Sequence, residues 1–188
     1  MMVNVDIAAL AIKELIAAFG VEEDDHTRDT PMRAAKAWEA ILGGYLENPA
    51  DHLERTFSAP NDPGLVMVSG IRIQSMCAHH LLPFSGVATV AYRPSPGQRI
   101  VGISKLARVI QGYSRRLQVQ EQIGWQTVEA IKSRLNPSSA ICQITAVHDC
   151  MRLRGVQEPG AATTTVASQG LVLDHEWAMI DRQHRSHL

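Results

Sequence analysis

The hydrophobic residues of this chain change their spacing along the sequence, and this change most constrains the fold. Up to about position 45 they recur at helical intervals of three and four. Runs rich in β-branched residues follow, then helical spacing again, then further strand-like runs. The resulting order is helix, helix and then β-β-α-α-β-β. We therefore predict an α+β fold in which helices cover one face of an antiparallel sheet.

The first two predicted helices form an N-terminal region of their own. One covers residues 7–19 with Gly20 as its C-terminal cap, and the other begins at Asp29-Thr30-Pro31, with Asp29 as its N-cap. It ends near Gly43-Gly44. Residues 47–63 are polar and contain three prolines, which indicates a hinge. The chain is thus predicted to divide into a helical region at 1–62 and a second domain at 63–188.

The second domain contains the predicted sheet. Ser104 is a suitable N-cap for its first helix, and Asn136-Pro137 closes the next one. A short helix is expected at the end of the chain. The predicted strands cover 65–77, 86–92, 100–101, 140–150 and 163–173, and the two longer helices cover 104–113 and 119–135.

Charge is distributed unevenly although its total is close to neutral. The formal net charge is −1, but residues 1–62 carry −7, residues 63–120 carry +7 without a single acid, and residues 121–188 carry −1. The basic segment either forms a solvated face or faces an anion, and composition does not distinguish these readings. A hydrophobic content of 45% excludes the disordered class, and the near-neutral total does not indicate a nucleic-acid partner.

The cysteines and the N-terminal sequence bear on location. Three cysteines are an odd number, which argues against a disulfide framework and favours a reducing compartment. The apolar run at 7–19 is interrupted by Lys13 and Glu14 and has no basic leader, so it is not typical of a signal peptide. We expect a cytoplasmic protein with no membrane partner.

Two short fragments carry the residue types that bind zinc. Cys77-Ala78-His79-His80 and His148-Asp149-Cys150 offer thiolates and imidazoles. Strand alternation would place His148 and Cys150 on the same face. Four ligands would form a closed structural site, whereas three would leave a position for water, and the spacing alone does not choose between them. Cys142 is expected to be a buried apolar residue, and solvated side chains are expected for His26, His52, His175, His184 and His187, the last three in a frayed tail.

A candidate phosphate site lies in the acid-free segment. Ser104-Lys105-Leu106-Ala107-Arg108 opens a helix directly after a strand, so free N–H groups and two cations lie close together. An ordinary basic surface helix would carry the same residues. Glu121 ends this segment, and it is either an ion-pair partner or an acceptor for adjacent N–H donors. Guanine presents such a pair of donors in its ring N–H and exocyclic amine.

These residues belong to motifs that together resemble the GTP cyclohydrolase I family. The resemblance extends from about Asp29 to Gly170, with the motifs in the same order. The motifs are Cys77-x-His79-His80-Leu81-Leu82-Pro83-Phe84-x-Gly86, Gly102-Ile103-Ser104-Lys105-Leu106-Ala107-Arg108, Arg116-Leu117-Gln118-Val119-Gln120-Glu121, His148-x-Cys150-Met151 and Arg154-Gly155-Val156.

The resemblance implies a fold and a reaction. The fold is the tunnelling fold, in which antiparallel sheets of several subunits close into a barrel, assembled into a toroidal homo-oligomer, usually a decamer, with active sites between subunits. The reaction converts GTP and water to formate and 7,8-dihydroneopterin triphosphate, on the way to tetrahydrofolate and pterins. One zinc ion per subunit and GTP are the implied cofactor and partner.

The resemblance also implies roles for individual residues. Cys77, His80 and Cys150 match the family's zinc ligands, which leaves a fourth position open, and His79 and His148 match its proton-transfer histidines. The match to the guanine-reading pair is Gln120 and Glu121. The triphosphate pocket is matched by Ser104, Lys105, Arg108 and Arg154, and more weakly by Arg33 in the N-terminal helices.

Two positions depart from the family pattern. Ala78 stands where the family usually has Glu, and Asp149 stands where it usually has an apolar or aromatic residue. Strand alternation points Asp149 away from His148 and Cys150, so we do not expect it to replace the missing carboxylate. A non-catalytic or altered-specificity nucleotide-binding paralogue of the same fold therefore stays open. A third possibility is a structural-zinc scaffold with His148 as fourth ligand.

Overall fold

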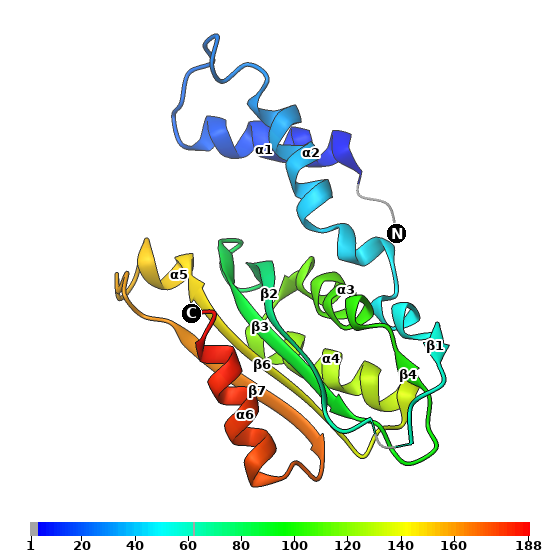
Figure 1. Ribbon diagram of the computed structural model, residues 1–188. Helices are drawn as coiled ribbons and strands as arrows, with labels where there is room; N and C mark the ends of the chain where they lie inside the picture. Colours follow the sequence, from blue (N-terminus) through cyan, green and yellow to red (C-terminus); the bar gives the residue numbers. More distant parts are fainter. Residues whose placement is uncertain (1–3, 62) are drawn as a thin grey trace.

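A curled five-stranded sheet forms the centre of the computed structural model, which describes residues 4–61 and 63–188 (Figure 1). The strand order is β5-β2-β3-β6-β7. Strands β2, β3, β6 and β7 pair antiparallel as predicted, whereas β5 runs parallel to the end of β2. A two-stranded ladder joins β1 (Thr56–Phe57) to β4 (Ile100–Val101). The bounds in the main sheet are β2 Val66–Cys77, β3 Pro83–Arg93, β5 Leu117–Gln118, β6 Ser139–His148 and β7 Thr163–Gly170.

Helices cover both faces of the sheet. On one face α3 (Ile103–Ser114) and α4 (Gln120–Leu135) bury alternate residues of the strands, among them Cys142, which is 0% exposed as expected of an apolar residue. On the other face α6 (Asp174–Arg185) packs Ile180 against Ile141. The α+β prediction is confirmed, but the prediction that helices cover only one face is wrong for α6.

The burial of α6 also corrects the prediction of a frayed tail. His184 is 1% exposed, with Nδ1 3.0 Å from Thr89 Oγ1 and Nε2 2.9 Å from Thr145 Oγ1. Buried Glu176 pairs with Arg93 and accepts a hydrogen bond from the Leu173 amide at 2.9 Å. Because these polar groups all find partners, a helix with polar residues on its inner side is stable against the sheet.

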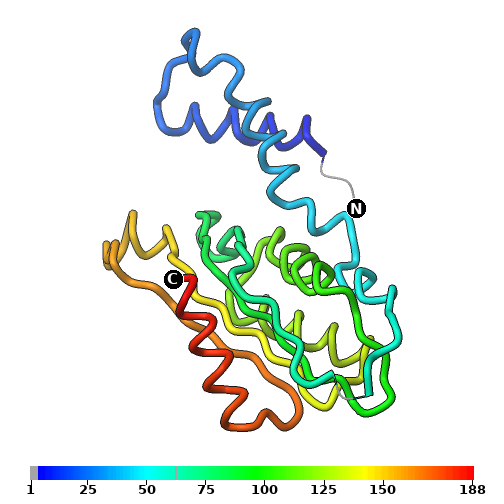
Figure 2. Tube along the Cα trace, in the orientation of Figure 1, coloured from blue at the N-terminus to red at the C-terminus, as the bar shows by residue number. Residues whose placement is uncertain are grey.

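The N-terminal helices α1 (Val5–Ala18) and α2 (Thr30–Ile41) pack against each other and stand clear of the sheet (Figures 1 and 2). Helix α1 ends before Gly20, whose φ of +72° is typical of a C-terminal cap. Asp29 is the N-cap residue of α2 as predicted, but its side chain makes no capping hydrogen bond. Asp29 Oδ2 instead accepts a hydrogen bond from Arg33 Nη2 at 2.8 Å.

The segment predicted as a hinge is partly built into the core. It contains the 3₁₀ helix η2 (Pro49–Leu53), which follows η1 (Gly43–Leu46), and its Leu53 is buried in the main hydrophobic cluster. Helix α3 meets η2 closely because Gly112 has no side chain; a Cβ there would lie 2.8 Å from Pro49 Cγ. The division at 62/63 stays a prediction, and residue 62 lies outside the described residues.

Two element boundaries differ from those predicted. Strand β6 ends at His148, and the next residues form the short helix α5 (Asp149–Arg152). The N-cap of α3 is Gly102, so Ser104 lies inside the first turn and does not cap the helix. No helix in the described ranges is both long enough and apolar enough to cross a membrane.

Candidate active site

The three predicted zinc ligands converge at the end of β2. Cys77 is the last residue of this strand, and the following turn is closed by a hydrogen bond from the Leu81 amide to the Cys77 carbonyl at 2.9 Å. His80 lies in that turn, with Nδ1 3.6 Å from Cys77 Sγ. Cys150 approaches from α5. One ligand atom from each of the three residues lies within 4.8 Å of the other two.

The chemistry of this group fits a zinc ion. Two thiolates and an imidazole are donors that zinc prefers. Burial raises the pKa of the Cys150 thiol, and the neighbouring Cys77 raises this pKa further. A divalent cation favours the deprotonated thiols and thereby relieves their mutual repulsion.

Cys150 belongs to a different element from the one predicted. We expected His148 and Cys150 to share a strand face, but β6 ends at His148 and Cys150 lies in the helical turn of α5. In the described part of the chain the converging group holds three residues and does not include His148. This arrangement argues against a closed four-ligand site.

His148 is held in a defined orientation by two neighbours. Its Nε2 lies 2.8 Å from Gln120 Oε1, and since a carboxamide oxygen only accepts, Nε2 carries the proton and Nδ1 keeps its lone pair when the ring is neutral. The ring stacks on Phe84 with centroids 4.5 Å apart. Burial lowers the pKa of His148, and the negative charge of Glu121 partly offsets this shift. Phe84 was missed as a site residue, although it stands in the first motif and pairs with His148 in the β3–β6 register.

The two residues of the predicted base-reading pair are the first two residues of α4, and their side chains lie in different environments. Gln120 is 2% exposed, and its Nε2 faces three acceptors, namely the carbonyls of Ile144 and Thr163 and the hydroxyl of Thr165. Its carboxamide is fully engaged within the protein, so it has no side-chain group left to read a base. The Glu121 side chain is exposed and makes no hydrogen bond or ion pair with any residue in 4–61 or 63–188.

Two further predicted residues lie beside the metal ligands. Arg154 Nη1 is 3.0 Å from His80 Nε2, and exposed His79 has its Nδ1 4.0 Å from Cys77 Sγ. The two departures from the family pattern do not meet here. Ala78 is exposed, and Asp149 Oδ1 accepts a hydrogen bond from Arg152 Nη1 at 3.2 Å.

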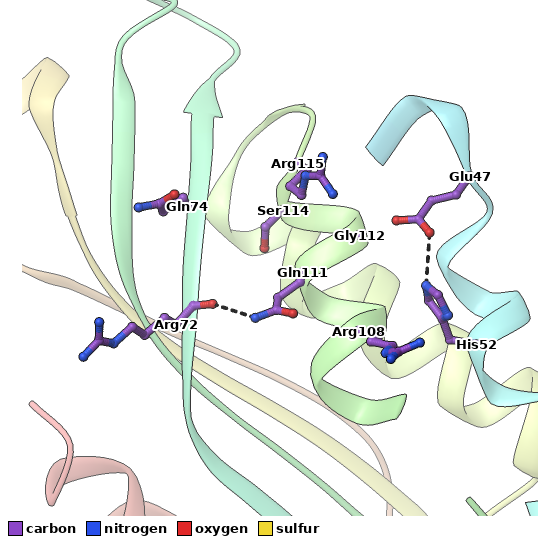
Figure 3. A pocket seen from close by; sticks show the side chains of 9 residues that line it. All are labelled: Glu47, His52, Arg72, Gln74, Arg108, Gln111, Gly112, Ser114 and Arg115. Carbon is purple, nitrogen blue, oxygen red and sulfur yellow. Dashed lines mark hydrogen bonds and ion pairs between the residues drawn. The ribbon is translucent and has the colours of Figure 1, made fainter. Parts of the chain in front are cut away.

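The predicted phosphate-binding residues of α3 lie away from this group. Arg108 lines a cavity of about 560 Å³ together with Gln111 and Arg115, and the Glu47–His52 pair, 3.0 Å apart, lies across from them (Figure 3). The three metal-ligating residues do not line this cavity.

The length of α3 accounts for this separation. Its C-terminal end leads into β5, which pairs with Cys77, whereas Ser104 and Lys105 lie in its first turn. Ten residues of helix between Lys105 and Arg115 span about 15 Å. Arg33, on α2 and paired with Asp29, also lies outside the group. Within one chain, Arg154 therefore lies beside the metal group, whereas the predicted phosphate residues of α2 and α3 do not.

A second cavity, of about 430 Å³, lies between α4 and β7. Glu121, Gly124 and Trp125 form its helical wall, and residues 165–168 form the wall opposite. None of the three metal ligands lines this cavity, but its Glu121 directly follows Gln120, the residue that holds His148. Trp125, which stands between Gly124 and Gln126, was not singled out from the sequence.

Comparison with known proteins gives consistent matches along most of the chain. The family described as GTP cyclohydrolase I matches residues 8–181. A protein named GTP cyclohydrolase 1 from Carboxydothermus hydrogenoformans is 41% identical over 171 residues, which cover 90% of this chain and 88% of that protein. One of the same name from Mycolicibacterium vanbaalenii is 43% identical over 164 residues, covering 87% and 81%. A solved structure of archaeosine synthase QueF-Like covers 61% of this chain and 99% of its own, at 20% identity and a TM-score of 0.47, too low to support a statement about fold.

Proposed function

The chain belongs to the GTP cyclohydrolase I family, and on this premise we propose that it is a zinc-dependent enzyme that opens the purine ring of GTP. The products would be formate and 7,8-dihydroneopterin triphosphate. The observation that carries the proposal is the convergence of Cys77, His80 and Cys150 next to a histidine whose free nitrogen is fixed by Gln120. A cytoplasmic location is part of the same proposal.

The chemistry can be divided among the residues of the group. Cys77, His80 and Cys150 would hold a zinc ion, which acts as a Lewis acid and lowers the pKa of a water molecule for attack on carbon 8 of the base. Neutral His148 accepts a proton at Nδ1 and returns it to the departing amine. His79, exposed beside the ligands, is the second proton-transfer group. Glu121 accepts the two N–H donors of guanine, and Gln120 acts on the base only through His148.

The phosphate end of the substrate requires a second copy of the chain. Ser104 and Lys105 lie in the first turn of α3, about 15 Å of helix from its C-terminal end, and Arg108 lies about 10 Å from that end. We propose that these residues serve the metal group of a neighbouring subunit, with Arg154 contributing from the metal side and Arg33 from the N-terminal helices. The separation along α3 supports active sites between subunits, and the proposed assembly is a toroidal homo-oligomer of the tunnelling fold, in decameric form.

A direct assay tests this function. The protein is loaded with zinc and incubated with GTP while formate and pterin fluorescence are measured. The expected result is equimolar release of both, abolished by a chelator and restored by zinc. A fully zinc-loaded protein that gives neither product would exclude the catalytic role.

A specific observation favours one alternative, a non-catalytic or altered-specificity paralogue that binds nucleotides. The turn of Cys77 lacks a carboxylate at Ala78, and Asp149 does not supply one, because it pairs with Arg152. GTP binding without turnover, with turnover gained in Ala78→Glu, would establish this alternative. Turnover in the unmodified chain would reject it.

A further inference from the structure

An exposed tryptophan lies on the wall of the cavity that contains Glu121. Trp125 is 52% exposed, although it belongs to α4, whose inner residues form much of the core. Large aromatic side chains are mostly buried, so an indole facing an open cavity indicates a contact that the single chain does not complete. The cavity, at about 430 Å³, is within the size range of small-molecule sites.

Helix geometry brings the indole close to the carboxylate. Glu121 and Trp125 are four residues apart, so they lie one above the other on the same face of α4. Helical side chains lean toward the N-terminus, and the indole therefore lies over the turn that carries Glu121. An acceptor for N–H donors and an aromatic surface thus stand side by side.

A glycine in the helical wall determines how closely the opposite wall, strand β7, approaches α4. A Cβ at Gly124 would lie 3.3 Å from the Cβ of Ala167, so glycine lets β7 approach α4 closely. The cavity is bounded by Trp125 and Glu121 on one side and by residues 165–168 on the other. Glu121 in its wall directly follows Gln120, whose side chain is hydrogen-bonded to the catalytic candidate His148.

We propose that Trp125 is the surface on which the guanine base of the substrate stacks while Glu121 accepts its N–H donors. This inference rests on the proposed function and names one more substrate-contacting residue of the same site. Stacking of a base on an aromatic side chain contributes about 5- to 150-fold in affinity. An aromatic surface holds any base, so Trp125 would supply affinity and Glu121 discrimination.

The kinetic test separates base binding from phosphate binding. Trp125→Ala should raise KM for GTP about 5- to 150-fold, Trp125→Leu nearly as much, and Trp125→Phe the least. The inhibition constant of inorganic tripolyphosphate, which has no base, should stay unchanged in all three. An unchanged KM in Trp125→Ala would overturn the proposal. A parallel loss of tripolyphosphate affinity and of assembly mass would also overturn it, because Trp125 would then be a subunit contact.

A binding measurement makes the test independent of turnover. GTP should quench the tryptophan fluorescence of the protein, and Trp125→Phe should remove the quench. Trp177→Phe is the matched control, because Trp177 lies on α6 against the other face of the sheet, and it should keep the quench. If the protein binds GTP without forming products, a quench that depends on Trp125 supports the inference while the catalytic proposal fails. A quench that persists in Trp125→Phe overturns the inference alone.

Discussion

Gln120 Oε1 accepts a hydrogen bond from His148 Nε2 at 2.8 Å, and this contact fixes which nitrogen of the histidine is free. Gln120→Glu would place a negative charge at the same point and should raise the pKa of His148. Gln120→Met, of similar size without a charge, should not raise it. An NMR titration of the His148 ring measures both, and equal pKa values in the two variants would show that the contact is absent in solution.

Glu121 is predicted to determine which base is used. Glu121→Gln should keep its zinc but lose discrimination for GTP over ITP, which lacks the exocyclic amine, by up to about 10⁴-fold. The measurement is kcat/KM for both nucleotides. Glu129→Gln is the matched control, since Glu129 is an exposed acid on the same helix, and its ratio should equal that of the unmodified protein. An unchanged ratio in Glu121→Gln would remove Glu121 from the base site.

Zinc binding is expected to be separable from folding. Cys150→Ser should fold with the circular dichroism of the unmodified protein, contain little zinc and lose turnover, because Cys150 lies at the edge of the core rather than in it. Metal analysis and circular dichroism on one sample decide the point. A variant that unfolds would instead favour a structural role for the metal.

Folding stability should fall on mild acidification because of His184. Burial lowers the pKa of His184, with Asp181 partly offsetting and His187 adding to this shift. The unfolded chain therefore binds the proton more readily, and stability is lost as the pH falls below about 6.5, the pKa of the unfolded residue. Arg185 also faces this region through its ion pair with Asp181.

His184→Gln isolates this effect. It should cost about 1–3 kcal/mol at pH 7.5, because hydrogen bonds to Thr89 and Thr145 are lost or distorted. Urea unfolding at pH 7.5 and 5.5 should show a smaller loss on acidification in the variant than in the unmodified protein. Equal losses would place the titrating group elsewhere, with His148, whose pKa is also lowered by burial, as the first residue to examine.

Mixing two inactive variants tests whether subunits share sites. Lys105→Ala and Glu121→Gln damage opposite ends of the proposed substrate site, and the structure places these residues on different helices. If each site takes Glu121 from one chain and Lys105 from another, co-refolded equal amounts should regain about one quarter of the sites. A mixture that stays inactive would place both residues in the same chain's site.

The local spacing of hydrophobic residues was sufficient to predict most helices and strands. It failed at positions whose environment depends on residues far away in the sequence. His184 was expected to be solvated because its neighbours in sequence are polar, but Thr89 and Thr145, on two strands far away in the chain, supply its partners. Strand alternation was extended two residues too far at Cys150 because the turn into α5 has no proline or glycine to mark it.

The site shows the same limit. Gln120 and Glu121 were interpreted as a pair, but adjacent residues at the start of a helix point about 100° apart. One therefore enters the core while its neighbour faces the cavity. Trp125 was not singled out, although the predicted helix over 119–135 already placed it four residues after Glu121; the cavity that both residues line is visible only in the structure.

The length of α3 has a consequence for how the protein would behave on dilution. If metal and phosphate groups at opposite ends of that helix must come from different chains, turnover per chain falls once the concentration drops below the dissociation constant of assembly. Each chain would remain folded in these conditions and keep its zinc ligands together. Dilution would then switch the enzyme off reversibly without unfolding it.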